Sequence, residues 1–350
     1  MSVLARVPAS ALFLAAVALA CVFGPMLSPH PFDRVYPDYV LAEPSFEARP
    51  SAGELLAAAE AFASRLGARL DEAEDAGEAL LMRISADRPI EAAALGDQPP
   101  SDMLGPPRLL EAREGGREMS LEAPVKRELF PAGADANGRD LLTRTLIAGR
   151  VSLAVGLAAS LVALVVGVAY GAFAGLMGGA VDALMMRVVE VVYALPFIFL
   201  VIVLVMTFGR RLELIFLAVG AVEWLDMARI ARGQTLALKE KDYVAAARAL
   251  GASPFAILAR HILPNAAAPI LAFLTLLVPR AILLESFISF LGLGVQEPLT
   301  SWGALIAEGA RHIQGALHLL LFPALFLGAT LAALQSLGET LQARVAGRAS

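Results

Sequence analysis

The chain has 350 residues, of which 58% are hydrophobic and 17% charged, and its mean hydropathy is +0.68. Soluble domains are about half apolar and about a quarter charged, so this composition excludes an ordinary soluble globule. Residues 31–145 contain 13 Lys and Arg against 22 Asp and Glu, a net of −9, which leaves +4 for the rest of the chain and gives −5 overall. The single cysteine, Cys21, excludes an intramolecular disulfide, and basic patches interleaved with aromatic residues are lacking, which excludes nucleic acid as a partner. The composition therefore predicts contact with the lipid bilayer.

Six stretches are apolar enough to cross a bilayer, which requires roughly 20 mostly apolar residues in one helix. In chain order they are residues 10–27, 151–173, 188–208, 212–228, 264–291 and 313–337. We therefore predict an all-α membrane protein with six transmembrane helices and both termini on one side. The predicted parts are an N-terminal transmembrane helix (1–30), an insert (31–130), a membrane domain (131–342) and a tail (343–350). The first helix has an alternative as a cleaved secretory signal peptide, because Ala18-Leu19-Ala20 resembles a cleavage site.

The insert between the first two spans is predicted to be only partly folded. Apolar residues recur every three or four positions at Leu55, Ala59, Phe62, Leu66 and Leu70, which indicates one amphipathic helix. Prolines punctuate the remainder, and few β-branched or aromatic residues are available for a core. We expect a solvated segment with one or two helices packed on the membrane domain, rather than a dedicated ligand-binding domain.

Lys and Arg in short loops set the orientation of membrane helices, because they are enriched on the cytoplasmic side. Residues 229–260, between the fourth and fifth spans, carry six of them, and Arg344 and Arg348 follow the last span. Arg210 and Arg211 lie on the opposite side and contradict the rule, but they are outnumbered. This distribution predicts cytoplasmic termini and an extracytoplasmic insert. Within the second span, Gly167, Gly171 and Gly175 recur every four residues and predict a close helix contact.

The basic cytoplasmic loop is predicted to form two helices joined by a sharp turn. Asp242 can cap a helix over residues 243–250, and Gly251 is placed for its left-handed stop. Ser253 and Pro254 can begin a second helix that ends before Pro264. A connecting loop needs no such construction, so we predict a protruding knob that docks into a groove on a cytoplasmic partner. An amphipathic hairpin lying on lipid headgroups is the alternative.

The sequence contains no recognisable catalytic, cofactor-binding or metal-binding motif. A phosphate-binding loop, a zinc-protease motif and a serine-hydrolase motif are all missing, and the four histidines are scattered. The carboxylates of the predicted spans, Glu190, Glu223, Asp226 and Glu285, leave a proton-coupled secondary transporter open as an alternative function. Structural pairing of Asp226 with Arg229, or of Arg280 with Glu285, explains these acids as well. A membrane scaffold without transport is a further alternative.

The cytoplasmic loop resembles the EAA loop of binding-protein-dependent ABC importer permeases. That pattern is E-A-A, three residues, G, nine residues and I-x-L-P, and it is matched at Ala246, Ala247, Gly251, Leu263 and Pro264. Ala245 stands where the family has Glu, and His261 stands at the usual Ile.

Three further segments are similar to the dipeptide and oligopeptide branch of this family. They are Asp135-Ala-Asn-Gly-Arg-Asp140, the segment 224–235 (WLDMARIARGQT) and the segment 285–303 (ESFISFLGLGVQEPLTSWG). The resemblance covers residues 130–341, and it does not extend to residues 31–129.

The resemblance implies a permease subunit that imports oligopeptides or dipeptides across the bacterial cytoplasmic membrane. In the family, two permeases pair around a translocation path, two ATP-binding subunits hydrolyse ATP with Mg²⁺, and an extracytoplasmic solute-binding protein delivers the solute. This chain is then not an enzyme and binds no cofactor. Its implied coupling loop is residues 235–264, with the site residues Asp242, Tyr243, Ala245, Ala246, Ala247, Arg248, Gly251, Leu263 and Pro264. Glu285, near the end of the fifth span, is expected to be a gate or a subunit contact.

Overall fold

The protein is described by a computed structural model over residues 8–90, 95, 101–209 and 211–349. The chain divides into two compact units, and we describe each by itself. The helical unit comprises Met1–Pro29 and Thr143–Ser350, and the insert domain comprises His30–Leu142. Two residues used in the sequence analysis, Arg210 and Ser350 at the end of the tail, lie outside the described residues.

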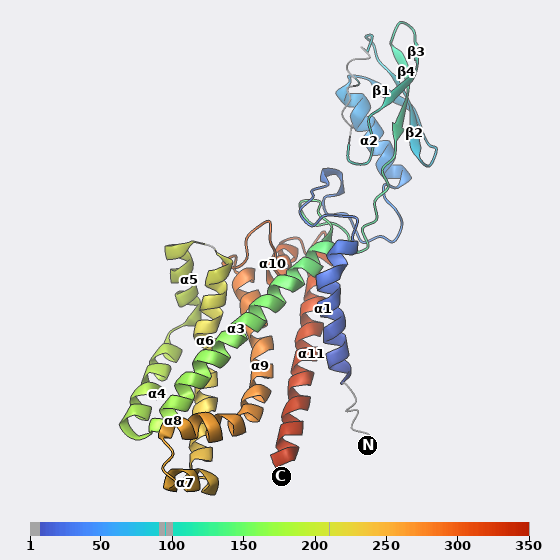
Figure 1. The fold of residues 1–350 in the computed structure, drawn as a ribbon. Coiled ribbons are helices and arrows are strands. Elements are labelled where there is room, and N and C mark those ends of the chain that lie inside the picture. The colour runs from blue at the N-terminus through green and yellow to red at the C-terminus, as the bar shows by residue number, and fades with distance from the viewer. Residues whose placement is uncertain (1–7, 91–94, 96–100, 210, 350) are drawn as a thin grey trace, which may run out of the picture. The chain divides into compact units, whose positions relative to one another are not determined.

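The helical unit consists of long apolar helices joined by short connections (Figure 1). Its elements are α1 (Ala9–Leu27), α3 (Leu141–Met177), α4 (Gly179–Ala194), α5 (Phe197–Phe208), α6 (Leu212–Lys239), α7 (Asp242–Ala249), α8 (Pro254–Ile257), a π-helical turn (Leu258–Ile262), α9 (Leu263–Phe290), α10 (Trp302–Arg311) and α11 (His318–Ala349). The predicted tail is helical through Ala349, because α11 runs past the expected end of the membrane domain.

Four stretches of the described chain are long and apolar enough to cross a membrane, which makes this a multi-pass membrane protein. The pair α4 and α5 is bent by 78° and would make a fifth span if it crosses as one. Helix α6 carries six charged residues in its 28 and is not among these candidates. The count of six spans therefore stays a prediction.

Small residues bring α3 and α6 into close contact, as the glycine spacing predicts. A Cβ atom added at Gly171 would overlap the carbonyl oxygen of Ala228, and one at Gly175 would lie 3.0 Å from the carbonyl oxygen of Arg232. The hydrophobic effect contributes little to helix association within lipid, so van der Waals packing matters more there. Close approach of the two backbones increases that packing.

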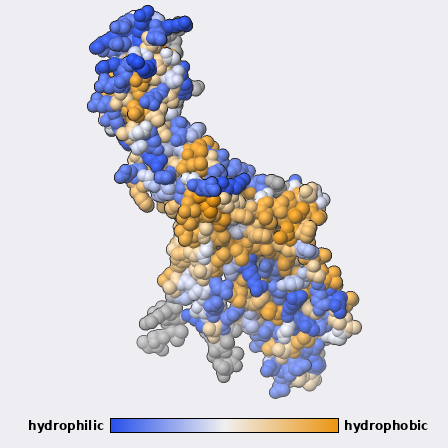
Figure 2. All heavy atoms as spheres, turned by 180° about the vertical axis from the view of Figure 1, so that it is seen from behind, coloured by the Kyte–Doolittle hydropathy of each residue, from blue (hydrophilic) through white to orange (hydrophobic). Residues whose placement is uncertain are grey.

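The two ends of the helical unit differ in what they carry. Helix α7 lies at the same end as the start of α1 and the end of α11, whereas α5 and α10 lie at the other end (Figure 1). On the face that Figure 2 shows, apolar side chains form a broad band over the part of this unit away from α7, and hydrophilic ones gather at the end with α7. Such a band is the surface expected of helices that face lipid.

The insert domain is not all-α, which corrects the sequence-based expectation. It contains α2 (Ala52–Arg65) and four antiparallel strands in the order β1-β2-β4-β3, namely β1 (Arg69–Asp75), β2 (Ala79–Ser85), β4 (Glu118–Pro124) and β3 (Arg108–Arg113). The inward residues of the central strands and of α2 form a core of their own. Its members include Tyr39, Leu55, Ala59, Phe62, Leu80, Met82, Ile84, Leu121 and Phe130.

The expected amphipathic helix is present but shorter than its apolar spacing suggested. Ser51 caps α2 by accepting from the Glu54 backbone N–H, while Glu54 accepts from the Ser51 N–H at 2.7 Å, which makes a capping box. Leu66 follows the end of the helix, and Leu70 belongs to β1. The apolar period of four thus continues past the helix because the next strand contributes to the same core.

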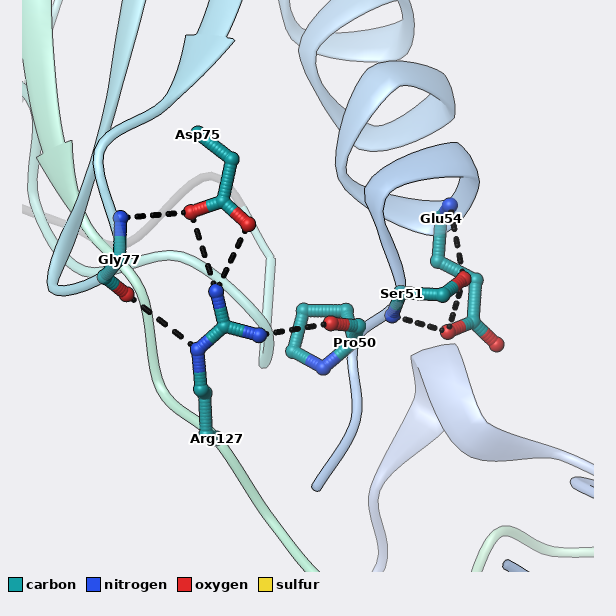
Figure 3. Close-up of polar contacts among 6 residues, drawn as sticks. All are labelled: Pro50, Ser51, Glu54, Asp75, Gly77 and Arg127. Carbon is teal, nitrogen blue, oxygen red and sulfur yellow. Dashed lines mark hydrogen bonds and ion pairs between the residues drawn. The ribbon is translucent and has the colours of Figure 1, made fainter. Parts of the chain in front are cut away.

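Arg127 ties the turn between β1 and β2 to the segment that precedes α2 (Figure 3). Its guanidinium donates to both carboxylate oxygens of Asp75 at 3.0 and 2.7 Å and to the carbonyl oxygens of Gly77 and Pro50, each at 3.2 Å. The hydrogen bonds from Arg127, and another from the Gly77 N–H, hold the pKa of Asp75 below its usual value. The Arg127 side chain therefore connects two loops through hydrogen bonds alone.

The insert domain extends beyond the predicted boundary at residue 130. The motif at residues 135–140 folds into a tight turn, in which Asp135 accepts from the Arg139 side chain at 2.8 Å and from two backbone N–H groups. A Cβ atom at Gly138, whose φ is +77°, would overlap the carbonyl oxygen of Tyr36. Tyr36 belongs to the insert core, so this turn packs with the insert and moves the boundary to Leu142.

Candidate functional site

The loop between α6 and α9 forms a short helix, a sharp turn and a second helical segment, as the sequence predicts. Helix α7 spans Asp242–Ala249, one residue earlier than expected, and Lys241 occupies the cap position without a side-chain hydrogen bond. The predicted cap by Asp242 is therefore wrong. Asp242 lies in the first turn instead, where its negative charge is favourable to the helix dipole.

The turn after α7 depends on glycine. Gly251 has φ of +84°, in the left-handed region, where L side chains are strained, so its predicted role as a helix stop is confirmed. The Ser253 side chain then accepts from the Ala256 N–H at 3.3 Å, and Pro254 takes the first helical position, as predicted.

The expected helix end before Pro264 does not occur. The chain stays helical from Pro254 to Phe290, and residues Leu258–Ile262 form a π-helical turn in which the Leu263 N–H donates to the carbonyl oxygen of Leu258. Pro264 has no N–H and lies in the first turn of α9, where that donor is not needed. The wider turn thus absorbs the proline without a break.

A small apolar core holds α7 in place and leaves most of the helix exposed. Val244, fully buried, packs with Ile257 and Ile262. The predicted coupling residues distribute around this anchor: Asp242, Tyr243, Ala245, Ala246, Arg248, Gly251 and Pro264 are exposed, and Ala247 and Leu263 are half-buried. The structure therefore brings Asp242 to Gly251 onto one protruding knob, while Leu263 and Pro264 begin the long helix behind it.

Two exposed apolar side chains at this turn escaped the sequence analysis. Leu250 is 89% exposed and Phe255 60% exposed, and they flank the Gly251 turn. The ring of Phe255 stacks on that of Phe173, with their centroids 6.2 Å apart, whereas Leu250 is almost fully exposed. Their position next to the glycine stop and the Ser253 cap could have revealed them.

The base of the knob is braced by charged contacts to neighbouring helices. The Lys239 ammonium donates to the carbonyl oxygens of Leu176 at 2.6 Å and Gly175 at 3.2 Å, which caps the end of α3. The Arg232 guanidinium donates to both carboxylate oxygens of Asp182 on α4, at 2.5 and 2.6 Å. These contacts fasten the end of α6, next to the knob, to α3 and α4.

Glu285 is the centre of a buried polar cluster at the other end of α9. Its side chain is fully buried and accepts from Ser152 on α3 at 2.9 Å and from Ser289 at 2.7 Å. The hydroxyl of Ser152 in turn accepts from the backbone N–H of Trp302, and that of Ser289 from the N–H of Val295. The carboxylate thus ties α3, α9 and the start of α10 together.

Glu285 has no exposed surface within this chain, and its hydrogen bonds are made to serines of the same chain. Its expected role as a gate or subunit contact stays a prediction. The suggested pairing of Arg280 with Glu285 is wrong, because Arg280 lies 3.3 Å from Asp226 on α6.

The other intramembrane acids are placed differently from one another. Asp226 lies 3.9 Å from Arg229 as well as 3.3 Å from Arg280, whereas Glu190 pairs with Arg187 at 2.8 Å on the exposed side of α4. Within the described ranges, no group of three or more His, Cys, Asp or Glu side chains is arranged to hold a metal ion. That this chain has no catalytic, cofactor or metal site stays a prediction.

The family model for binding-protein-dependent transport system inner membrane components matches residues 167–350. This chain belongs to that family. The match includes α7, the Gly251 turn and α9, so the resemblance drawn from the EAA-like loop is confirmed at the level of the family. The family is one of binding-protein-dependent transport, which does not favour the proton-coupled alternative.

Two relatives illustrate which transport systems are similar. The oligopeptide transport system permease protein OppC of Escherichia coli K12 is 53% identical over 224 residues, which cover 64% of this chain and 74% of OppC. The dipeptide transport system permease protein DppC of Bacillus subtilis is 44% identical over 211 residues, 60% of this chain and 66% of DppC. Among solved structures, a chain of the inward-facing MetNI methionine ABC transporter matches 59% of this chain and 96% of its own length, with 17% identity and a TM-score of 0.48.

Proposed function

We propose that this chain is the permease subunit of an ATP-driven importer that moves oligopeptides or dipeptides across the bacterial cytoplasmic membrane by alternating access. The observation that carries the proposal is the knob of residues 242–251, which combines a single buried anchor, Val244, with an exposed apolar tip. The identity to oligopeptide and dipeptide permeases supports peptides as the solute class.

In this proposal the knob docks into a groove on an ATP-binding subunit. ATP and Mg²⁺ are bound by two such subunits, and their closure moves α7. Because Arg232 and Lys239 hold α6 to α4 and α3, the helices follow the knob as one body. A second permease completes the path, and an extracytoplasmic solute-binding protein delivers the peptide.

The test is uptake of radiolabelled tripeptide into proteoliposomes that contain the purified complex and its binding protein. With the binding protein outside the vesicles, we expect uptake to require ATP inside them. A proton gradient should not change the uptake. Uptake driven by the gradient alone would establish the secondary-transport alternative, and assembly without any uptake would leave a scaffold.

The knob itself is tested by Gly251→Val. A β-branched residue in the left-handed region costs about 1 kcal/mol or more, which should tilt α7 and reduce both co-purification of the ATPase and peptide-stimulated ATP hydrolysis. Gly251→Asn is the matched control, because Asn tolerates this conformation. Equal coupling in both variants would refute the docking assignment.

The proposed topology has six spans, cytoplasmic termini and an extracytoplasmic insert. In a Cys21→Ala background, Ser64→Cys on the insert should react with an impermeant thiol reagent in intact cells whose outer membrane, if any, is permeabilised. Ser253→Cys, exposed beside the knob, should be protected. The reverse labelling would invert the topology.

A further inference from the structure

A cavity of about 750 Å³ lies among α4, α5, α6 and α9. Its size falls within the range of about 300–1,000 Å³ that is usual for small-molecule sites. The wall is mainly apolar and includes Leu195, Phe197, Leu225, Leu283, Leu284 and Phe287. Leu195 and Phe197 line it at the break between α4 and α5, which are bent by 78°. Glu223, on its wall, lies about 17 Å along α6 from the start of that helix.

The charged groups of this cavity are unequally matched. Asp226 is 3.3 Å from Arg280 and 3.9 Å from Arg229, so both guanidinium groups are directed at it. Arg229 also lies over the ring of Tyr193, 4.5 Å from its centroid. Glu223, three residues before Asp226 on the same face of α6, takes part in neither pair.

Glu223 lacks what a buried carboxylate needs. It is 7% exposed, and its Oε2 atom has no hydrogen-bond partner among the residues that the structure describes. An ionised carboxylate buried in this way costs several kcal/mol unless a cation or donor meets it. The cavity therefore presents, on a largely apolar wall, a buried carboxyl group with an oxygen atom that no hydrogen bond satisfies among the described residues.

We propose that this cavity is a peptide-binding site on the translocation path, in which Glu223 binds the free amino group of the peptide. The inference rests on the proposed function, because it takes peptides as the solute. Every unmodified peptide carries an N-terminal ammonium, so one carboxylate recognises all of them without reading their sequence. The apolar wall accepts varied side chains, since apolar contact is not directional.

The experiment measures peptide binding to the whole importer complex in nanodiscs, with the solute-binding protein omitted so that its own selectivity does not enter. Saturation-transfer NMR compares trialanine, N-acetyl-trialanine and N-acetyl-Ala-Ala-Lys. We expect the wild type to bind trialanine about tenfold or more tightly than N-acetyl-trialanine, which is the effect of one charge-assisted hydrogen bond. Glu223→Gln should remove that preference.

Glu213→Gln is the matched control, because it makes the same change on the same helix at an exposed position outside the cavity. It should keep the preference. If Glu223→Gln does not assemble, Glu223→Asp keeps the charge but withdraws it by one methylene, and the preference should fall without vanishing.

Four results would overturn the assignment. The first is that the wild type does not bind trialanine, and the second is that it binds trialanine and N-acetyl-trialanine equally, as it would if a cation of the partner permease fills the cavity. The third is an unchanged preference in the assembled Glu223 variant. The fourth is binding of N-acetyl-Ala-Ala-Lys as tight as that of trialanine, which would show that any ammonium suffices. Each is distinct from a failure of the proposed function, in which the complete wild-type importer moves no peptide in the proteoliposome assay.

Discussion

The helical unit and the insert domain solve the same problem, burial of backbone and apolar surface, in two different solvents. The helical unit leaves many large apolar side chains exposed and buries polar clusters, such as Glu285 with its serines. The insert domain does the reverse, with a core under α2 and ion pairs such as Asp75 with Arg127 at its surface. In the insert domain, therefore, apolar side chains are buried and charged ones exposed, whereas in the helical unit large apolar side chains are also exposed. A residue's hydrophobicity alone does not predict its burial in both units.

The two units also differ in how they relate to the family match. The family match begins at residue 167 and lies wholly in the helical unit, and the insert has its own core. An element with its own core can be added between two helices without changing their packing. This independence can be tested.

The largest effect is expected from the insert core. Leu121 is fully buried in β4, so Leu121→Ala should lower the free energy of unfolding of the insert by about 2–5 kcal/mol. Leu109→Ala is the control, because Leu109 is its cross-strand neighbour on β3 and 40% exposed. Hydrogen exchange of the whole complex should accelerate in the insert only. Equal acceleration in α6 and α9 would show that the two units are not independent.

A smaller effect is expected from the contact of α3 with α6. Gly171→Ala places a methyl group against the carbonyl of Ala228, and such overpacking costs about 1–3 kcal/mol. Gly233→Ala is the control, because a Cβ atom there meets nothing within 4 Å. The yield and thermal stability of the solubilised complex should fall only for Gly171→Ala. Similar values for both variants would mean that α3 and α6 do not pack as described.

The smallest effect concerns pH and the insert surface. Since the folded pKa of Asp75 is lowered, its pairing stabilises the insert above the unfolded pKa, near 3.9, and this stabilisation is lost as pH falls through the folded value. The pair is partly exposed, so we expect less than about 1 kcal/mol. Asp75→Asn should reduce the pH dependence of the unfolding midpoint of the insert between about pH 5 and 2. An unchanged pH dependence would show that the pairing of Asp75 with Arg127 does not stabilise the insert.

Local rules predicted much of the helical unit. The apolar runs, the glycine stop at 251 and the cap at Ser253 each depend on a few neighbouring residues, so a single sequence carries them. The position of the α7 cap and the continuous helix through Pro264 did not follow, because the π-helical turn depends on how the second segment packs.

The insert sheet escaped for a different reason. Its strand β3 (RLLEAR) is exposed along its whole length, and β1 (RLDEAED) is dominated by charge, so neither shows a clear alternation. Only β2 and β4 alternate, and their inward residues are mostly Leu, Met and Ala rather than β-branched. The partners of Glu285 were equally hidden, because Ser152 lies 133 residues away in sequence.

That separation has a consequence for how the protein is made. At about 5–20 residues per second, the ribosome needs roughly 7–27 s after Ser152 to reach Glu285. During that interval the Ser152 hydroxyl on α3 lacks its carboxylate acceptor. It can instead donate a hydrogen bond to a backbone carbonyl of its own helix. The cluster closes only when α9 and then Trp302 have been made, so this junction of α3, α9 and α10 forms late in synthesis, with only the rest of α10 and α11 still to follow.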